Sequence, residues 1–228
     1  MNVVWVLLLL IVAAALPAII AFLWFRAKKI PVTLPWFLAS LAAGLISLLI
    51  AALIQGFLPA FGGDGLGTIF FTIFVRIALL EELSRLFALV PLLLIIRRRR
   101  SIDAPFVAAV GLAAGLGFAM LESAFYGMAD FRITLLRAFT AAPLHGACGI
   151  RVGAALAFFI GKNRVKAVFL LISAVFIHGA YNLAIVSPAL ISVLAILIAI
   201  AALFSSLQYI KAEEDDDENS FNTTYTQP

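Results

Sequence analysis

The chain has 228 residues, of which 64% are hydrophobic and only 12% are charged, and its mean hydropathy is +1.15. An ordinary soluble domain is roughly half apolar and about a quarter charged, so this composition excludes a soluble globular protein. Inside a bilayer only helices or closed barrels satisfy their backbone groups. The apolar runs are continuous, without the alternation that barrel strands need. The sequence therefore predicts an all-α, polytopic bundle of membrane helices.

Seven apolar segments follow one another, each near or above the roughly 20 residues that cross a bilayer. Basic clusters occupy every second connection, around Arg26, Arg97–Arg100 and Lys162–Lys166. Since basic connections stay in the cytoplasm, we expect an external N-terminus and a cytoplasmic C-terminus. The expected membrane helices cover residues 3–25, 35–58, 68–96, 105–127, 133–160, 166–187 and 189–210.

The chain divides into two parts by composition. Residues 1–210 are expected to form one integral membrane domain, with its core motifs within residues 76–184. Residues 211–228 include the unbroken acidic run Glu213–Glu218 and predict a disordered cytoplasmic tail. Topology accounts for the surplus positive charge, so no nucleic-acid partner is expected.

Ionisable side chains stand out in four consecutive apolar segments. Each costs roughly 2.5–3.5 kcal/mol at the centre of a spanning helix, so such residues mark function by default. We therefore expect four helices to converge on one polar cavity. The candidate residues are Glu81, Glu82, Arg85, Glu122, His145, His178 and Asn182.

Helical spacing indicates which of these groups cooperate. Arg85 lies within one turn of both Glu81 and Glu82 and can partly neutralise the pair. One carboxylate then pairs with the guanidinium, and the other is available as a general base or acid. His178 and Asn182 share one helix face. Purely structural readings remain open, with Glu82–Arg85 as an ion pair and His178–Asn182 as an interhelical hydrogen bond.

Two further features concern the surroundings of this cavity. Arg137 is expected only as a neighbour of the site. Small residues at four-residue spacing allow helices to approach closely in lipid, and such spacings involve Gly111, Gly115, Gly117, Gly149 and Gly153.

The four motifs, in this order, resemble those of the PrsW-type glutamic intramembrane proteases, within the wider group that includes the CAAX prenyl proteases. The resemblance rests on Glu81-Glu82-x-x-Arg85, Phe118-x-x-x-Glu122, His145 and His178-x-x-x-Asn182. It implies an endopeptidase that cuts a membrane-anchored protein in the plasma membrane of a bacterium or archaeon. Site-1 cleavage of a membrane regulator, such as an anti-sigma factor, is the form of cleavage that the resemblance suggests.

The resemblance also implies a role for each residue. Glu81 or Glu82 would activate a water, His178 and Asn182 would stabilise the oxyanion, and Glu122 and His145 would complete the cavity. A metal stays open, because His145, His178 and Glu122 are a sufficient ligand set for catalytic zinc. The sequence has no His-Glu-x-x-His signature, and the resemblance favours a metal-free glutamate mechanism with no cofactor.

Two functions from other classes fit the same residues. Glutamate and histidine chains in membranes also form proton relays, as in a small proton-coupled transporter. A non-catalytic scaffold could retain the polar cluster as a structural element. The substrate and the oligomeric state do not follow from the sequence.

Overall fold

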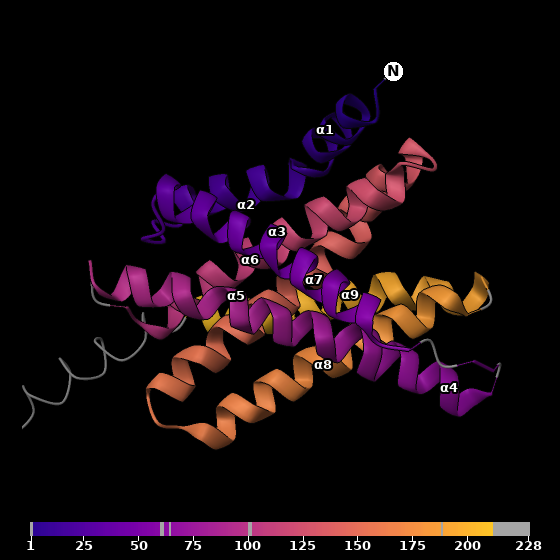
Figure 1. The fold of residues 1–228 in the computed structure, drawn as a ribbon. Coiled ribbons are helices and arrows are strands. Elements are labelled where there is room, and N and C mark those ends of the chain that lie inside the picture. The colour runs from indigo at the N-terminus through magenta and orange to yellow at the C-terminus, as the bar shows by residue number, and fades with distance from the viewer. Residues whose placement is uncertain (1, 60–61, 64, 100–101, 188, 212–228) are drawn as a thin grey trace, which may run out of the picture.

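The long helical spans run back and forth and cross one another in the middle of the bundle (Figure 1). The computed structural model describes residues 2–59, 62–63, 65–99, 102–187 and 189–211, without the side chains of 189–192. Within this part of the chain there are no strands, and the predicted acidic tail lies outside it, apart from Lys211. The elements are α1 (Val3–Ala14), α2 (Leu16–Ala27), α3 (Leu34–Phe57), α4 (Leu66–Phe70), η1 (Phe71–Leu79), α5 (Leu80–Arg97), α6 (Ala104–Gly127), α7 (Phe131–Ile160), α8 (Arg164–Val186) and α9 (Ala189–Lys211).

Six helices of the described chain are long and apolar enough to cross a membrane. They confirm an all-α polytopic membrane protein and cover every expected segment except residues 68–96. That segment is helical throughout, as α4, η1 and α5 in succession. Glu81, Glu82 and Arg85 interrupt its apolar character. The six spans are Val3–Ala27, Leu34–Phe57, Ala104–Gly127, Phe131–Ile160, Arg164–Val186 and Val193–Lys211.

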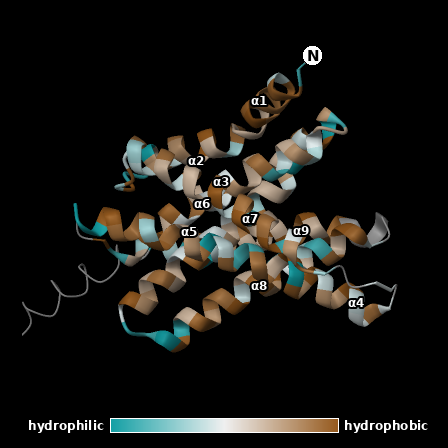
Figure 2. Ribbon diagram, in the orientation of Figure 1, coloured by the Kyte–Doolittle hydropathy of each residue, from teal (hydrophilic) through white to brown (hydrophobic). Residues whose placement is uncertain are grey.

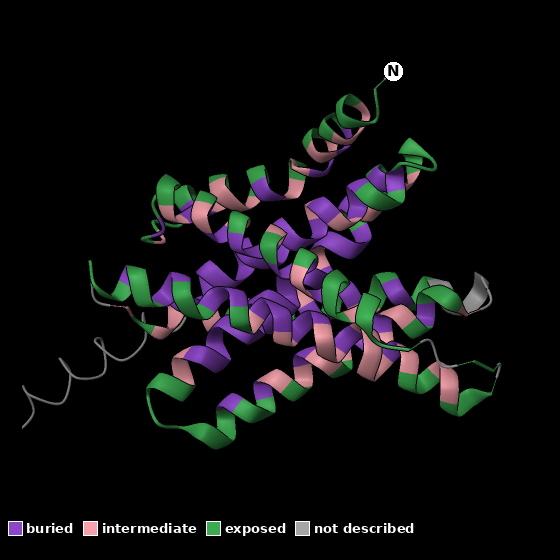
Figure 3. Ribbon diagram, viewed as in Figure 1, coloured by how far each residue is buried: buried purple, intermediate pink, exposed green. Residues whose placement is uncertain are grey.

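The outer surface of the bundle is apolar, as a lipid-facing surface must be. Large side chains such as Trp5, Leu53 and Phe169 are more than 60% exposed. Figure 3 shows buried residues gathered along α6 and α7 at the centre, with exposed residues on the outer helices. A soluble monomer rarely leaves so much apolar surface uncovered. The helices therefore bury the polar groups and the small residues together with part of the large apolar side chains, and they present the other apolar side chains to the membrane.

The hydrophilic ends of the helices gather mainly at the two sides of the bundle. The C-terminal ends of α2 and α5 and the turn between α7 and α8 lie at the left of the view in Figure 2, and they hold the basic clusters. The turn between α6 and α7 lies at the opposite side. This arrangement is the alternation that the basic clusters predicted. Which side faces the cytoplasm stays a prediction.

The close packing of α6 against α7 depends on glycine. A Cβ atom on Gly111 would lie 2.1 Å from the carbonyl oxygen of Gly149, and one on Gly115 would lie 2.0 Å from that of His145. Gly153 packs in the same way on the carbonyl of Val107, at 2.4 Å. These contacts involve backbone atoms, which cannot move aside as a flexible side chain can. The predicted role of the small residues in helix packing is confirmed.

The segment before Glu81 is a wide π-helical stretch rather than an α-helix. It comprises Phe71–Leu79 and runs directly into α5. Such stretches are rare in proteins overall, and those that occur are often at functional sites. Phe74 of this stretch packs on Gly179, where a Cβ atom would meet its ring at 2.3 Å. This contact brings α8 close to the start of α5, which places His178 beside the glutamates.

Replacing Gly111 with Val is expected to destabilise the bundle by about 1–3 kcal/mol, because the new side chain collides with the backbone of α7. The matched control is Gly56→Val, since a Cβ atom at Gly56 meets nothing within 4 Å. Thermal unfolding in detergent measures both variants. Equal stability of the two variants would contradict this account of helix packing.

Candidate active site

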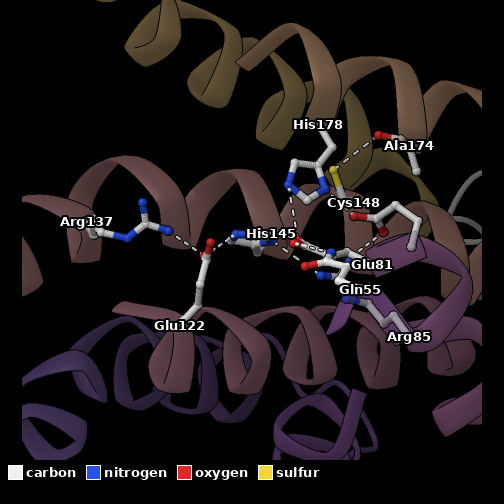
Figure 4. Close-up of polar contacts among 10 residues, drawn as sticks. Gln55, Glu81, Arg85, Glu122, Arg137, His145, Cys148, Ala174 and His178 are labelled. Carbon is white, nitrogen blue, oxygen red and sulfur yellow. Dashed lines mark hydrogen bonds and ion pairs between the residues drawn. The ribbon is translucent and has the colours of Figure 1, made fainter. Parts of the chain in front are cut away.

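A chain of polar side chains crosses the core of the bundle (Figure 4). It begins at Arg137, passes through Glu122 and His145, and reaches Arg85 with the two neighbouring glutamates. The residues come from α5, α6, α7 and α8. Four helices therefore do converge on one polar cluster.

Glu82 is held on both carboxylate oxygens. Its Oε2 pairs with Nη1 of Arg85, one helical turn further along α5, and both side chains are fully buried. Its Oε1 lies 2.8 Å from Nδ1 of His178. An ionised carboxylate only accepts hydrogen bonds, so Nδ1 of His178 carries the proton and donates. Glu82 is thus the fixed counter-charge at the centre of the cluster.

His145 connects the two halves of the polar chain. Its Nδ1 lies 3.3 Å from Nη2 of Arg85, and its Nε2 lies 2.8 Å from Oε2 of Glu122. A guanidinium has only donors, so Nδ1 accepts and the proton of the neutral imidazole lies on Nε2. The ring also packs edge-on against His178, with 4.9 Å between centroids. Arg85 and Glu122 therefore hold this imidazole by its two nitrogens, and His178 packs against the ring.

The carboxylate of Glu81 makes fewer and longer polar contacts than that of Glu82. Its side chain is buried, and Oε1 receives only a long hydrogen bond of 3.5 Å from Nε2 of Gln55. Its Oε2 is buried without a hydrogen-bond partner among the described residues, 3.5 Å from Nε2 of His178. Because Nδ1 of His178 is the donor to Glu82, Nε2 presents a lone pair when the ring is neutral. An acceptor oxygen and an acceptor nitrogen thus face each other at 3.5 Å, so a proton or a cation shared by both would stabilise the pair.

The other end of the polar chain reaches the surface of the bundle. Glu122 pairs with Arg137, and their side chains are 17% and 16% exposed. The guanidinium of Arg137 lies over the ring of Tyr126, 4.3 Å from its centroid. This end of the cluster is the more accessible one, whereas the side chains of Glu82 and Arg85 are fully buried.

The structure brings together most of the residues that the sequence singled out. Asn182 is the exception, since it is half-buried one turn beyond His178 and makes no side-chain hydrogen bond among the described residues. Of the interhelical hydrogen bonding left open above for this pair, the described residues show only the contact of His178 with Glu82 of α5. The residues that meet are Glu81, Glu82, Arg85, Glu122, His145 and His178.

Two members of the cluster were missed or underrated. Gln55 of α3 contacts Glu81, and its backbone carbonyl accepts from Arg76 at 3.0 Å. Gln55 is the only amide or charged side chain in the apolar segment 35–58, a signal that could have pointed to it. Arg137 was expected only as a neighbour, yet it pairs directly with Glu122.

The cluster also suits a metal ion, although with a different carboxylate from the one expected. Ligand atoms of Glu82, His145 and His178 lie within 4.8 Å of one another, whereas the expected set had Glu122 in place of Glu82. Two imidazoles and a carboxylate are the donor set of many catalytic zinc sites. The unpartnered oxygen of Glu81 adds a further acceptor at the same place. The donor set therefore fits a divalent cation, which would replace contacts such as that between His145 and Arg85.

Comparison with known proteins agrees with the motifs. Residues 32–207 match the model of a family described as PrsW family intramembrane metalloprotease. The matched range includes every residue of the polar cluster, from Gln55 to His178, and also Asn182. No curated protein and no solved structure gives a significant match.

Proposed function

This chain belongs to the PrsW family of intramembrane metalloproteases, and we propose that it hydrolyses a membrane-anchored protein with Glu81 as the general base. The observation that carries this assignment is the free oxygen of Glu81. Oε2 is buried and accepts no hydrogen bond from the described residues, while both oxygens of Glu82 are bound by Arg85 and His178. A base needs an unoccupied acceptor within reach of the water that it activates. Glu81 meets this requirement and Glu82 does not.

The proposed reaction follows from this arrangement. A water beside Glu81 and His178 gives one proton to Oε2 of Glu81 as its oxygen attacks the scissile carbonyl carbon. When the carbon–nitrogen bond breaks, Glu81 returns the proton to the leaving amine. Glu82 stays ionised and bound to Arg85, so the charge of the cluster around the reacting atoms is fixed throughout.

The donor to the oxyanion is proposed to be Asn182. Its amide has no hydrogen bond among the described residues, and it shares a helix face with His178, so it is free to donate to a bound substrate. Glu122 would hold the Nε2 proton of His145 and thereby fix that ring. The Glu122–Arg137 pair, which is the more exposed end of the cluster, marks the side from which the peptide would reach it.

When a divalent cation such as zinc is bound, Glu82, His145 and His178 would hold it, and it would polarise the scissile carbonyl and favour ionisation of the water. A metal-assisted and a purely glutamic site would use Glu81 in the same role. The metal requirement is therefore a separate question from the identity of the base.

The proposed substrate is a membrane protein cut close to its membrane span. Site-1 cleavage of a membrane-bound regulator in a bacterial or archaeal plasma membrane is the proposed setting, by likeness to the family. The buried position of the cluster supports a substrate that unwinds locally, since an intact helix hides its carbonyls in its own hydrogen bonds.

The test compares membrane-protein fragments in cells that express the wild-type chain and in cells that express Glu81→Gln at equal level. New N-termini within or beside a membrane span are expected only with the wild type. Identical sets of fragments from both cells would overturn the proposed function, and a flux that depends on Glu81 without any new fragment would favour a transporter instead.

Metal binding has its own prediction, read by elemental analysis of the purified protein. His178→Ala and His145→Ala are expected to lose the metal, whereas Glu122→Gln is expected to keep it, since Glu82 rather than Glu122 completes the ligand group. Loss of metal in Glu122→Gln at an unchanged unfolding temperature would contradict this ligand set. Equal metal content in all variants would show that any metal is bound elsewhere.

A further inference from the structure

An apolar groove lies between α5, α7 and α8, away from the polar cluster. Its volume is about 410 Å³, and aliphatic and aromatic side chains such as Leu94, Leu156 and Val168 form its walls. This size is within the usual range of roughly 300–1,000 Å³ for small-molecule sites. Among the described residues that line it, Arg97 is the one with a charged side chain. The groove therefore has an apolar body and a single cationic end.

The groove opens toward a region of uncompensated positive charge. Arg97, Arg98 and Arg99 are exposed at the end of α5, and Ile160 and Ala167, which flank the basic turn between α7 and α8, also line the groove. None of these arginines has an ion-pair partner among the described residues. Asp103, the next acidic residue in the sequence, caps α6 by accepting a hydrogen bond from the backbone of Phe106 at 2.8 Å. The free charge at this end is thus available to an anion.

We propose that this groove binds an anionic glycerophospholipid, with an acyl chain along α5 and α8 and the phosphate against Arg97. An acyl chain matches the apolar walls, and a guanidinium can bind phosphate oxygens with two parallel hydrogen bonds. In Figure 2 the hydrophobic lengths of α5 and α8 end in hydrophilic stretches on the same side of the bundle, as this ligand requires. The site is independent of the proposed proteolysis, since it shares no residue with the polar cluster.

The experiment titrates the full chain in detergent with dioleoyl-phosphatidylglycerol or dioleoyl-phosphatidylcholine and measures retained lipid by native mass spectrometry. The wild type is expected to retain the anionic lipid about fivefold more strongly, as one basic side chain near a lipid phosphate provides. Arg97→Gln is expected to abolish this preference. Arg26→Gln, in a basic cluster that does not line the groove, is expected to keep it.

A second pair of variants tests the apolar walls. Val168→Trp fills the groove and is expected to weaken retention of both lipids several-fold, whereas Val165→Trp, exposed on the same helix but outside the groove, is expected to leave it unchanged. Equal retention of the two lipids by the wild type would overturn the proposal. So would equal effects of Arg97→Gln and Arg26→Gln, which would assign the preference to general surface charge.

Discussion

Replacing Glu81 with Gln is expected to lower the rate of substrate cleavage by about 10²–10⁴-fold, which is the usual contribution of a general base. The amide keeps the size of the side chain but cannot take a proton from water. Stability is expected to change little, because Glu81 makes only the long contact with Gln55 and the 3.5 Å approach to His178. The cleavage rate of a fluorogenic membrane peptide in vesicles measures the loss.

The matched control for this variant is Asp130→Asn. Asp130 is a carboxylate outside the cluster that accepts a hydrogen bond at the start of α7, and Asn can accept it equally well. The control is expected to cleave at the wild-type rate. A rate for Glu81→Gln within threefold of that control would remove Glu81 from the role of base.

Replacing Glu82 with Gln is expected to have a larger effect on the fold than on any single chemical step. It leaves the guanidinium of Arg85 fully buried without its counter-charge. Removal of one partner from a buried ion pair costs about 3–5 kcal/mol. We expect little folded protein from this variant, measured as the monodisperse fraction in detergent.

The double variant Glu82→Gln with Arg85→Met separates structure from chemistry. With both charges removed, the net cost of the buried pair disappears and folding is expected to recover. Cleavage is not expected to recover, because the fixed carboxylate beside His178 is gone. A double variant that folds and cleaves at the wild-type rate would show that the pair has only a structural role. A double variant no more stable than Glu82→Gln would contradict the charge argument.

The sequence was most informative at the residues whose placement in a bilayer costs the most free energy. Charged and histidine side chains are expensive in a bilayer, so Glu81, Glu82 and His178 could be identified without a structure, and the order of the motifs led to the correct family. For the same reason, long segments almost without charged residues predicted the membrane helices. The membership of the wider CAAX group and the direction of the chain across the membrane stay predictions.

What the sequence could not provide was the pairing across helices. Spacing within α5 predicted that Arg85 is close to both glutamates, but the side chain bonds to Glu82 and leaves Glu81 to Gln55. That choice depends on where His178 approaches, which is set by Phe74 and the packing on Gly179. The same applies to the group that could hold a metal, which contains Glu82 where the sequence led us to expect Glu122.

The most direct test of the account uses purified chain and a single-pass membrane substrate in vesicles prepared in H₂¹⁸O. The wild type is expected to release fragments whose new carboxyl terminus carries one ¹⁸O, and Glu81→Gln, with its polar cluster otherwise intact, is expected to release almost none. Labelled fragments at equal rates from both proteins would contradict the central claim that Glu81 activates the water.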